Sequence, residues 1–159
     1  ISFIRHGQSE YNLKKIVTGH ADVPLTENGI EQAQETALTL SNHFSLIYSS
    51  DLIRCRQTTS IINEKLQLPV IFDNRLRERD FGSFTGTSWE EIGDELRIKD
   101  KEQTYDYRPQ GGESVKDVQD RLFNLIDELK ENRKNGLLIL DLYVEHQLLG
   151  ETKFPNLGQ

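Results

Sequence analysis

The chain has 159 residues, of which 35% are hydrophobic and 28% charged, and its formal net charge is −7 at pH 7. This length fits one domain with its own hydrophobic core, and the composition excludes a disordered chain. The acidic balance argues against a general binder of nucleic acid or anionic membranes, and no hydrophobic run reaches the roughly 20 residues that span a bilayer. The single cysteine, Cys55, excludes an internal disulfide framework and suits a reducing, cytoplasmic location.

Short hydrophobic runs alternate with helical patterns along the first half of the chain. Residues 1–4 (ISFI) predict a buried strand, central in a parallel sheet. Thr26 is a good N-cap for the helix that follows, because hydrophobic residues recur after it at helical spacing. The pattern continues with strands predicted over residues 45–50 and 68–73 and a helix over residues 51–66.

The second half of the chain begins with a looser stretch, residues 75–112. It contains one short helical pattern, Trp89–Leu96, and we expect substrate specificity to lie here, because long irregular segments in compact domains are often functional. Ser114 then caps a predicted helix, and residues 137–140 (LLIL) predict a fourth strand. This alternation predicts an α/β fold, a three-layer α/β/α sandwich with a mainly parallel central sheet.

Chemically useful side chains stand where three of these strands end. Arg5 and His6 end the first strand, Arg54 opens the helix after the second, and Glu78 follows the third. The carboxyl ends of parallel strands share one edge of the sheet, where ligands bind. A histidine there can act as a nucleophile, an arginine can hold an oxyanion, and a carboxyl group beside a phosphate can protonate a leaving alcohol. Taken singly, each residue also has a plain structural interpretation, as a hydrogen-bonded strand end, a solvated arginine or a salt-bridged carboxylate.

Two other chemistries fit the sequence poorly. A cysteine phosphatase built on Cys55 would need an arginine six residues later, where Ile61 stands. The histidines are scattered and one cysteine adds no cluster, so a zinc site is not predicted. The four histidines are His6, His20, His43 and His146.

Five stretches of the chain together resemble the histidine phosphatase superfamily, the phosphoglycerate mutase-like proteins. In the family's order they are RHGQSEYN, TGHADVPLTENGIEQA, SSDLIRCRQT, LRERDFGSFTG and PQGGES. The resemblance spans residues 1–140, and five motifs in register are far more specific than any one of them. It implies the phosphoglycerate mutase-like fold and phosphoryl transfer to a histidine.

The resemblance also implies a role for individual residues. His6 would accept the phosphoryl group, Arg5 and Arg54 would clamp the phosphate, and Glu78 would donate a proton to the leaving oxygen. No metal or cofactor is implied, and the expected partner is a small phosphorylated metabolite, not nucleic acid or a membrane. The residues that would line the substrate site are Arg5, Asn12, Thr18, Gly19, Arg54 and Glu78.

The short interval between Glu78 and the GGES stretch, with Arg108 as its lone late arginine, resembles the phosphatase branch of the family. We therefore predict a metal-independent phosphomonoester hydrolase. Two alternatives stay open: a cofactor-dependent phosphoglycerate mutase, and a catalytically impaired member that binds a phosphorylated ligand. The substrate and the oligomeric state are open as well.

The resemblance breaks after Leu140. Family members have a second histidine directly after this strand, whereas here DLYVEHQ follows and His146 stands six residues beyond the strand. Either the chain is catalytically impaired or a segment between Leu140 and Asp141 is missing. We expect the second: residues 1–159 would form a single domain that lacks a segment after Leu140 and the closing C-terminal strand.

Overall fold

A computed structural model of the chain describes residues 1–132 and 135–141. Within these residues, four strands form one sheet in the order β1-β4-β2-β3, and every pairing is parallel. The predicted α/β fold with a parallel sheet is therefore confirmed. The strands are β1 (Ser2–Arg5), β2 (Leu46–Ser49), β3 (Val70–Phe72) and β4 (Gly136–Leu140).

The prediction that residues 1–4 form a fully buried central strand is wrong. Among the described residues, β1 pairs only with β4, and its first three residues are half-buried while Arg5 is exposed. The strands buried at every residue are β2 and β4, and β4 lies between β1 and β2. A hydrophobic run indicates a strand but not its place in the sheet, because strand order depends on contacts distant in the sequence.

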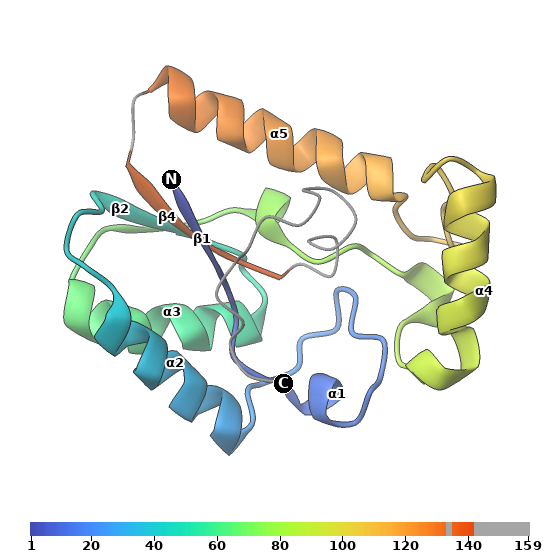
Figure 1. The fold of residues 1–159 in the computed structure, drawn as a ribbon, viewed down its shortest axis with the longest axis horizontal. Coiled ribbons are helices and arrows are strands. Elements are labelled where there is room, and N and C mark those ends of the chain that lie inside the picture. The colour runs from blue at the N-terminus through green and yellow to red at the C-terminus, as the bar shows by residue number, and fades with distance from the viewer. Residues whose placement is uncertain (133–134, 142–159) are drawn as a thin grey trace.

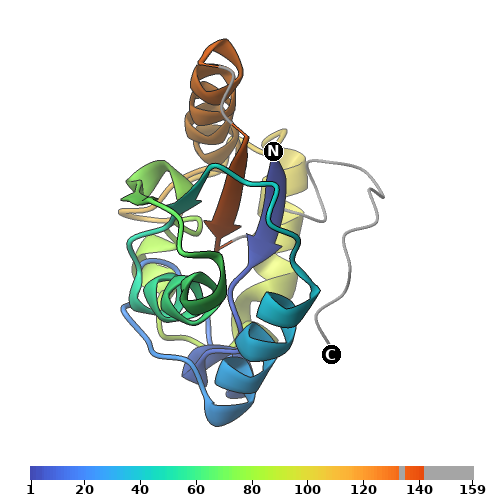
Figure 2. The same ribbon diagram turned by 90° about the vertical axis from the view of Figure 1, so that its left-hand side faces the viewer.

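Side chains that alternate along β2 and β4 fill two hydrophobic layers, one on each face of the sheet. On one face, Tyr48 and Leu138 pack against α5 (Val115–Glu131). On the other, Ile47 and Ile139 pack in a cluster with residues of α2 (Glu27–Thr39) and α3 (Ile53–Leu66). Figure 1 and Figure 2 show α5 on one side of the sheet and α2 and α3 on the other, which is the predicted three-layer arrangement.

The helices α2 and α5 begin where the sequence predicts. The Thr26 side chain accepts a hydrogen bond from the N–H of Gly29 at the start of α2. Ser114 and Asp117 form a complete capping box at the start of α5. A short helix, α1 (Glu10–Leu13), begins at a third capped residue, Ser9. These caps fix the points at which the chain leaves each loop.

The stretch from residue 75 to residue 112 is more ordered than its pattern predicts. It contains α4 (Trp89–Glu102), which runs six residues past the predicted end. The sequence pattern did not reveal these last turns, because they are mostly exposed and carry no hydrophobic stripe. Two 3₁₀ turns, η1 (Asn74–Leu76) and η2 (Gly82–Phe84), flank the segment that carries Glu78. A third hydrophobic cluster holds α4 in place, and it contains Val17, Phe81, Ile92 and Leu96.

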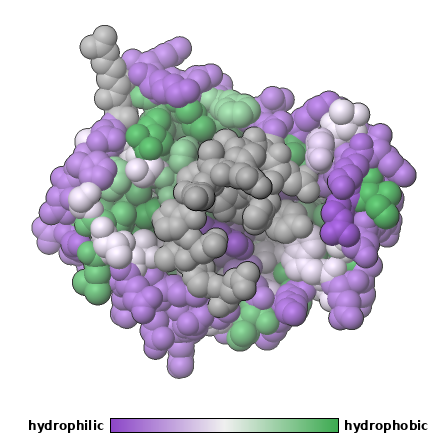
Figure 3. Space-filling view, in the orientation of Figure 1, coloured by the Kyte–Doolittle hydropathy of each residue, from purple (hydrophilic) through white to green (hydrophobic). Residues whose placement is uncertain are grey.

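The surface agrees with a polar chain. On the face shown in Figure 3, hydrophilic residues predominate around the margin, and hydrophobic residues gather where α5 covers the strands. In the part of the chain that the structure describes, none of the helices combines the length and the apolar character needed to cross a membrane.

Candidate functional site

The site lies at the carboxyl edge of the sheet, where β1 and β4 end side by side. The backbone N–H of His6 donates to the carbonyl of Leu140 over 3.2 Å, which extends the β1–β4 ladder by one step. The next residue is Gly7, and a Cβ atom there would lie only 2.1 Å from the carbonyl oxygen of Gly29. The chain therefore turns against the start of α2, and this turn buries His6, which is 6% exposed.

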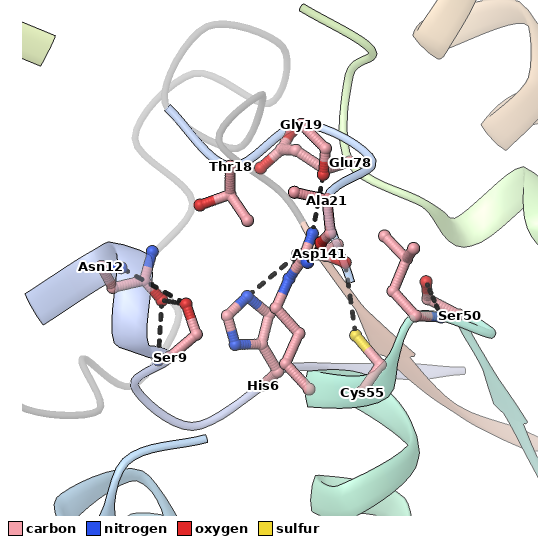
Figure 4. Close-up of polar contacts among 12 residues, drawn as sticks. His6, Ser9, Asn12, Thr18, Gly19, Ala21, Ser50, Cys55, Glu78 and Asp141 are labelled. Carbon is pink, nitrogen blue, oxygen red and sulfur yellow. Dashed lines mark hydrogen bonds and ion pairs between the residues drawn. The ribbon is translucent and has the colours of Figure 1, made fainter. Parts of the chain in front are cut away.

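The His6 ring is held at both nitrogens. Nδ1 lies 2.5 Å from the carbonyl oxygen of Gly7, and Nε2 lies 2.9 Å from Oδ1 of Asp141. A carbonyl oxygen can only accept, so Nδ1 carries the hydrogen in this contact. Nε2 is thus the nitrogen that faces the other polar groups of the site, and Figure 4 shows the ring pointing toward Asp141.

Arg54 reaches this place from the first turn of α3, as predicted, and is almost completely buried. Its Nε donates to Asp141 Oδ1 over 2.6 Å. Its Nη1 and Nη2 donate to the carbonyl oxygens of Ala21 and Gly19 over 2.7 and 2.9 Å. The last two bonds aim the guanidinium at the end of β4 and also fix the loop that precedes α2.

Asp141 lies in this site, and the sequence reasoning did not predict it. It is 1% exposed, and its Oδ1 is shared by His6 and Arg54. Burial alone would raise the pKa of the Asp141 carboxyl, but the positive charges of His6 and Arg54 hold that pKa below its usual range. A signal existed in the sequence, because a carboxylate directly after a wholly hydrophobic strand stands at the ligand edge of a parallel sheet.

Glu78 arrives at the same site from the segment after β3. Its side chain is buried, and Oε1 accepts a hydrogen bond from the backbone N–H of Arg79 over 2.7 Å. Its carbonyl oxygen lies 2.9 Å from His20 Nε2 and accepts from Arg121 Nη2 over 2.8 Å. Two side chains from different elements thus fix the backbone that positions the Glu78 carboxyl group.

The predicted pocket residues Thr18 and Gly19 lie beside this segment. Both are buried, and Gly19 adopts a left-handed conformation with φ +48°. A Cβ atom on Gly19 would be 2.8 Å from Thr85 Oγ1 and 3.3 Å from the backbone nitrogen of Phe81. The close approach and the positive φ both favour glycine, so this loop packs tightly against the segment that carries Glu78.

Within the part of the chain that the structure describes, two of the predicted residues form no hydrogen bond or ion pair with His6, Arg54 or Asp141. Arg5 is exposed at the end of β1, and the structure gives its guanidinium no hydrogen bond or ion pair to any residue it describes. The Asn12 side chain accepts hydrogen bonds from the backbone N–H and the hydroxyl of Ser9, which cap α1. Figure 4 shows this pair to one side of His6. Their roles in binding a substrate stay predictions.

The remaining candidates do not enlarge the site. Cys55 is buried with its Sγ 3.6 Å from Asp141 Oδ2, and burial together with that carboxylate raises the pKa of the thiol well above its usual range. It therefore stays a neutral thiol. Between residues 1 and 132 and between 135 and 141, no three His, Cys, Asp or Glu side chains gather in a way that could hold a metal ion. His146 lies outside the described residues.

Comparison with known proteins identifies the class. A model of the histidine phosphatase superfamily (branch 1) matches residues 1–148. The match covers most of the chain, so the chain belongs to this family, and the resemblance inferred from the motifs is confirmed.

Relatives within the family carry different names. The chain is 35% identical over 129 residues to a 2,3-bisphosphoglycerate-dependent phosphoglycerate mutase of Methylobacterium radiotolerans, a match that covers 75% of this chain and 60% of that protein. It is 36% identical over 135 residues to the fructose-2,6-bisphosphatase TIGAR of Xenopus tropicalis, with 81% of this chain and 49% of that protein covered. This chain therefore spans only half to three-fifths of the length of these two relatives.

A solved structure supports the same fold. A mycobacterial glucosyl-3-phosphoglycerate phosphatase, in complex with VO3, superposes with a TM-score of 0.74 at 30% sequence identity. The superposition covers 87% of this chain and 72% of that one. Phosphatases and mutases thus both occur among proteins similar to this chain.

Proposed function

We propose that the protein is a phosphomonoester hydrolase that works through a phosphohistidine on His6. The observation that carries the proposal is the orientation of the His6 ring. The Gly7 carbonyl binds Nδ1, so Nε2 points toward Asp141. Arg54 contacts the same carboxylate oxygen, which brings its guanidinium close to Nε2. This arrangement supports the proposal, because a candidate nucleophile and a candidate oxyanion-binding cation lie together at the ligand edge of the sheet.

The reaction would proceed in two steps. Nε2 of neutral His6 attacks phosphorus while the bond from phosphorus to the ester oxygen breaks, and Glu78 gives the leaving oxygen its proton. Water then gives a proton to the Glu78 carboxylate and attacks the phosphohistidine, the P–N bond breaks, and inorganic phosphate leaves. Arg54 stabilises the charge on the phosphoryl oxygens in both steps, since positioning and electrostatics supply most of the catalysis in phosphoryl transfer.

Hydrolysis of an aryl phosphate, followed by a panel of phosphomonoesters, tests this proposal. We expect turnover by the unmodified protein and none above background for His6→Ala. His43→Ala is the matched control, because His43 is an exposed histidine and should retain full activity. Glu78→Gln should lower the rate on alkyl esters by about 10²–10⁴-fold, the usual contribution of general acid catalysis. Retained turnover in His6→Ala would exclude His6 as the nucleophile.

A phosphoglycerate mutase is the second candidate, and the similarity to the Methylobacterium radiotolerans mutase favours it. In a mutase the phosphoryl group passes from His6 to a second hydroxyl of the sugar acid and not to water. Isomerisation of 3-phosphoglycerate in the presence of 2,3-bisphosphoglycerate, measured beside phosphate release, separates the two activities. Isomerisation faster than phosphate release would favour the mutase.

A phospho-ligand-binding protein without turnover is the third candidate. The observation that favours it is the Asp141 carboxylate, which stands between the proposed nucleophile and Arg54. Saturable binding of a phosphomonoester, with no phosphate release across the panel, would replace the enzyme proposal with this one.

A further inference from the structure

Asp141 joins the two residues on which phosphoryl transfer would depend. One oxygen, Oδ1, lies 2.9 Å from His6 Nε2 and 2.6 Å from Arg54 Nε. The carboxylate is 1% exposed, so water does not share these contacts to any large extent. The position that Oδ1 occupies, between a ring nitrogen and a guanidinium, is one in which a phosphate oxygen would also bind.

The contact has a consequence for His6. Both ring nitrogens face groups that accept hydrogen bonds, the Gly7 carbonyl at Nδ1 and the Asp141 carboxylate at Nε2. Both contacts are hydrogen bonds only when both nitrogens carry a hydrogen, which makes the ring an imidazolium. In that form Nε2 has no lone pair with which to attack phosphorus, so His6 cannot act as a nucleophile in this arrangement.

The hydrogen bonds of Arg54 indicate that a bound phosphate would have to displace Asp141. Each of its three nitrogens donates within the protein, and among residues 1–132 and 135–141 its one anionic partner is Asp141, because Ala21 and Gly19 supply neutral carbonyl oxygens. An oxyanion that binds the guanidinium along its Nε edge must take the position of Asp141 Oδ1. A phosphate and this carboxylate would also repel each other if both stayed close.

We propose that Asp141 determines the oxyanion affinity of the site, because its carboxylate occupies the position between His6 Nε2 and Arg54 that a phosphate oxygen would take. A ligand binds by displacing this carboxylate from both residues, and Nε2 can attack phosphorus once its proton has passed to the displaced carboxylate or to water. The inference rests on the proposed phosphate site, but it concerns the competition for that site and not turnover.

Equilibrium binding of orthovanadate and of orthophosphate, measured by calorimetry, tests the proposal. Asp141→Asn keeps the size of the side chain and removes its charge, so both ligands should bind at least about tenfold more tightly. Asp100→Asn is the matched control, because Asp100 is another buried carboxylate paired with an arginine, Arg79, outside the site. The control should lose stability without a gain in oxyanion affinity.

Equal or weaker binding by a folded Asp141→Asn protein would overturn the proposal, and so would the absence of oxyanion binding by both proteins. Thermal unfolding establishes that each variant is folded. The test is separate from that of the proposed function: tighter binding without turnover supports this inference and contradicts the enzyme, whereas turnover without tighter binding does the reverse.

A second measurement on the unmodified protein needs no variant to fold at position 141. The ¹⁵N resonances of His6, assigned through His6→Ala, should show a hydrogen on each ring nitrogen while the ring contacts the Gly7 carbonyl and Asp141. Orthovanadate should shift the Nε2 resonance as Asp141 is displaced. A neutral His6 ring in the free protein would contradict the arrangement from which the inference is drawn.

Discussion

Arg79 and Asp100 form a two-bonded ion pair inside the protein, with Nη1 donating to Oδ2 over 2.7 Å and Nη2 to Oδ1 over 2.9 Å. Arg79 also donates to the carbonyl oxygens of Glu113 and Tyr107. Because it directly follows Glu78, this one side chain ties α4 and the loop before α5 to the backbone of the proposed proton donor.

Replacing Arg79 by alanine should therefore be costly. The substitution leaves the Asp100 carboxylate buried without its partner, and the free energy of unfolding should fall by about 3–5 kcal/mol, the usual penalty for breaking a buried pair from one side. Urea unfolding measures the loss. Arg97→Ala is the control, since its pair with Asp94 is exposed and should contribute at most about 1 kcal/mol. Similar losses of unfolding free energy in both variants would contradict the stabilising role of the buried Arg79–Asp100 pair.

Gly7 should not tolerate a side chain. A Cβ atom there would lie 2.1 Å from the Gly29 carbonyl oxygen, so Gly7→Ala must move either the end of β1 or the start of α2. We expect a loss of about 1–3 kcal/mol or more, as for other overpacked sites, together with a loss of any activity that depends on His6.

The control for Gly7 is another glycine in a helix. A Cβ atom on Gly93 in α4 would meet only Trp89 at 3.8 Å, an ordinary contact. Gly93→Ala should therefore stabilise the protein by about 0.5–1 kcal/mol through helix propensity. Thermal unfolding of the two variants should give shifts of opposite sign, and a neutral Gly7→Ala would show that the turn is more open than described.

The capping box of α5 predicts a pH dependence. The Arg108 guanidinium and the Ser114 hydrogen bonds lower the pKa of Asp117 from 3.8 to about 2. A carboxylate whose pKa falls on folding contributes stability above its unfolded value of 3.8, and that stability is lost as the pH falls toward 2. The difference in unfolding free energy between the unmodified protein and Asp117→Asn should therefore shrink over this range.

Acid titration of chemical unfolding curves provides the measurement. Asp120→Asn is the control on the same helix, because that exposed carboxylate has no ion pair with any residue the structure describes. Its effect should vary less with pH than that of Asp117→Asn. A difference for Asp117→Asn that stays constant down to the acid limit would contradict the role of the Arg108 contact.

Local patterns in the sequence predicted the strands, the caps and the position of Arg54. A helix that opens directly after a strand places its first turn at the ligand edge, and this depends only on residues near Arg54. The same reasoning brought His6 and Glu78 to that edge. These residues were therefore within reach of the sequence alone.

Features of the site that depend on the order of the strands in the sheet could not be predicted from local patterns. Arg5 is exposed because β1 lies at an edge of the described sheet, and nothing within residues 1–7 determines this position. Asp141 contacts His6 because β1 and β4, far apart in the chain, pair in a register that sets Arg5 opposite Leu140. Such contacts are fixed by tertiary packing and not by the local pattern.

The central claim is that His6 carries the phosphoryl group, and trapping the intermediate tests it most directly. The protein should be mixed rapidly with an aryl phosphate, quenched in alkali, where phosphohistidine survives, and mapped by peptide mass spectrometry. We expect one added phosphoryl group on the peptide that contains His6, together with a burst of phenol release, and neither signal for His6→Ala. Turnover without a phosphorylated peptide, or a phosphoryl group on another residue, would contradict the account.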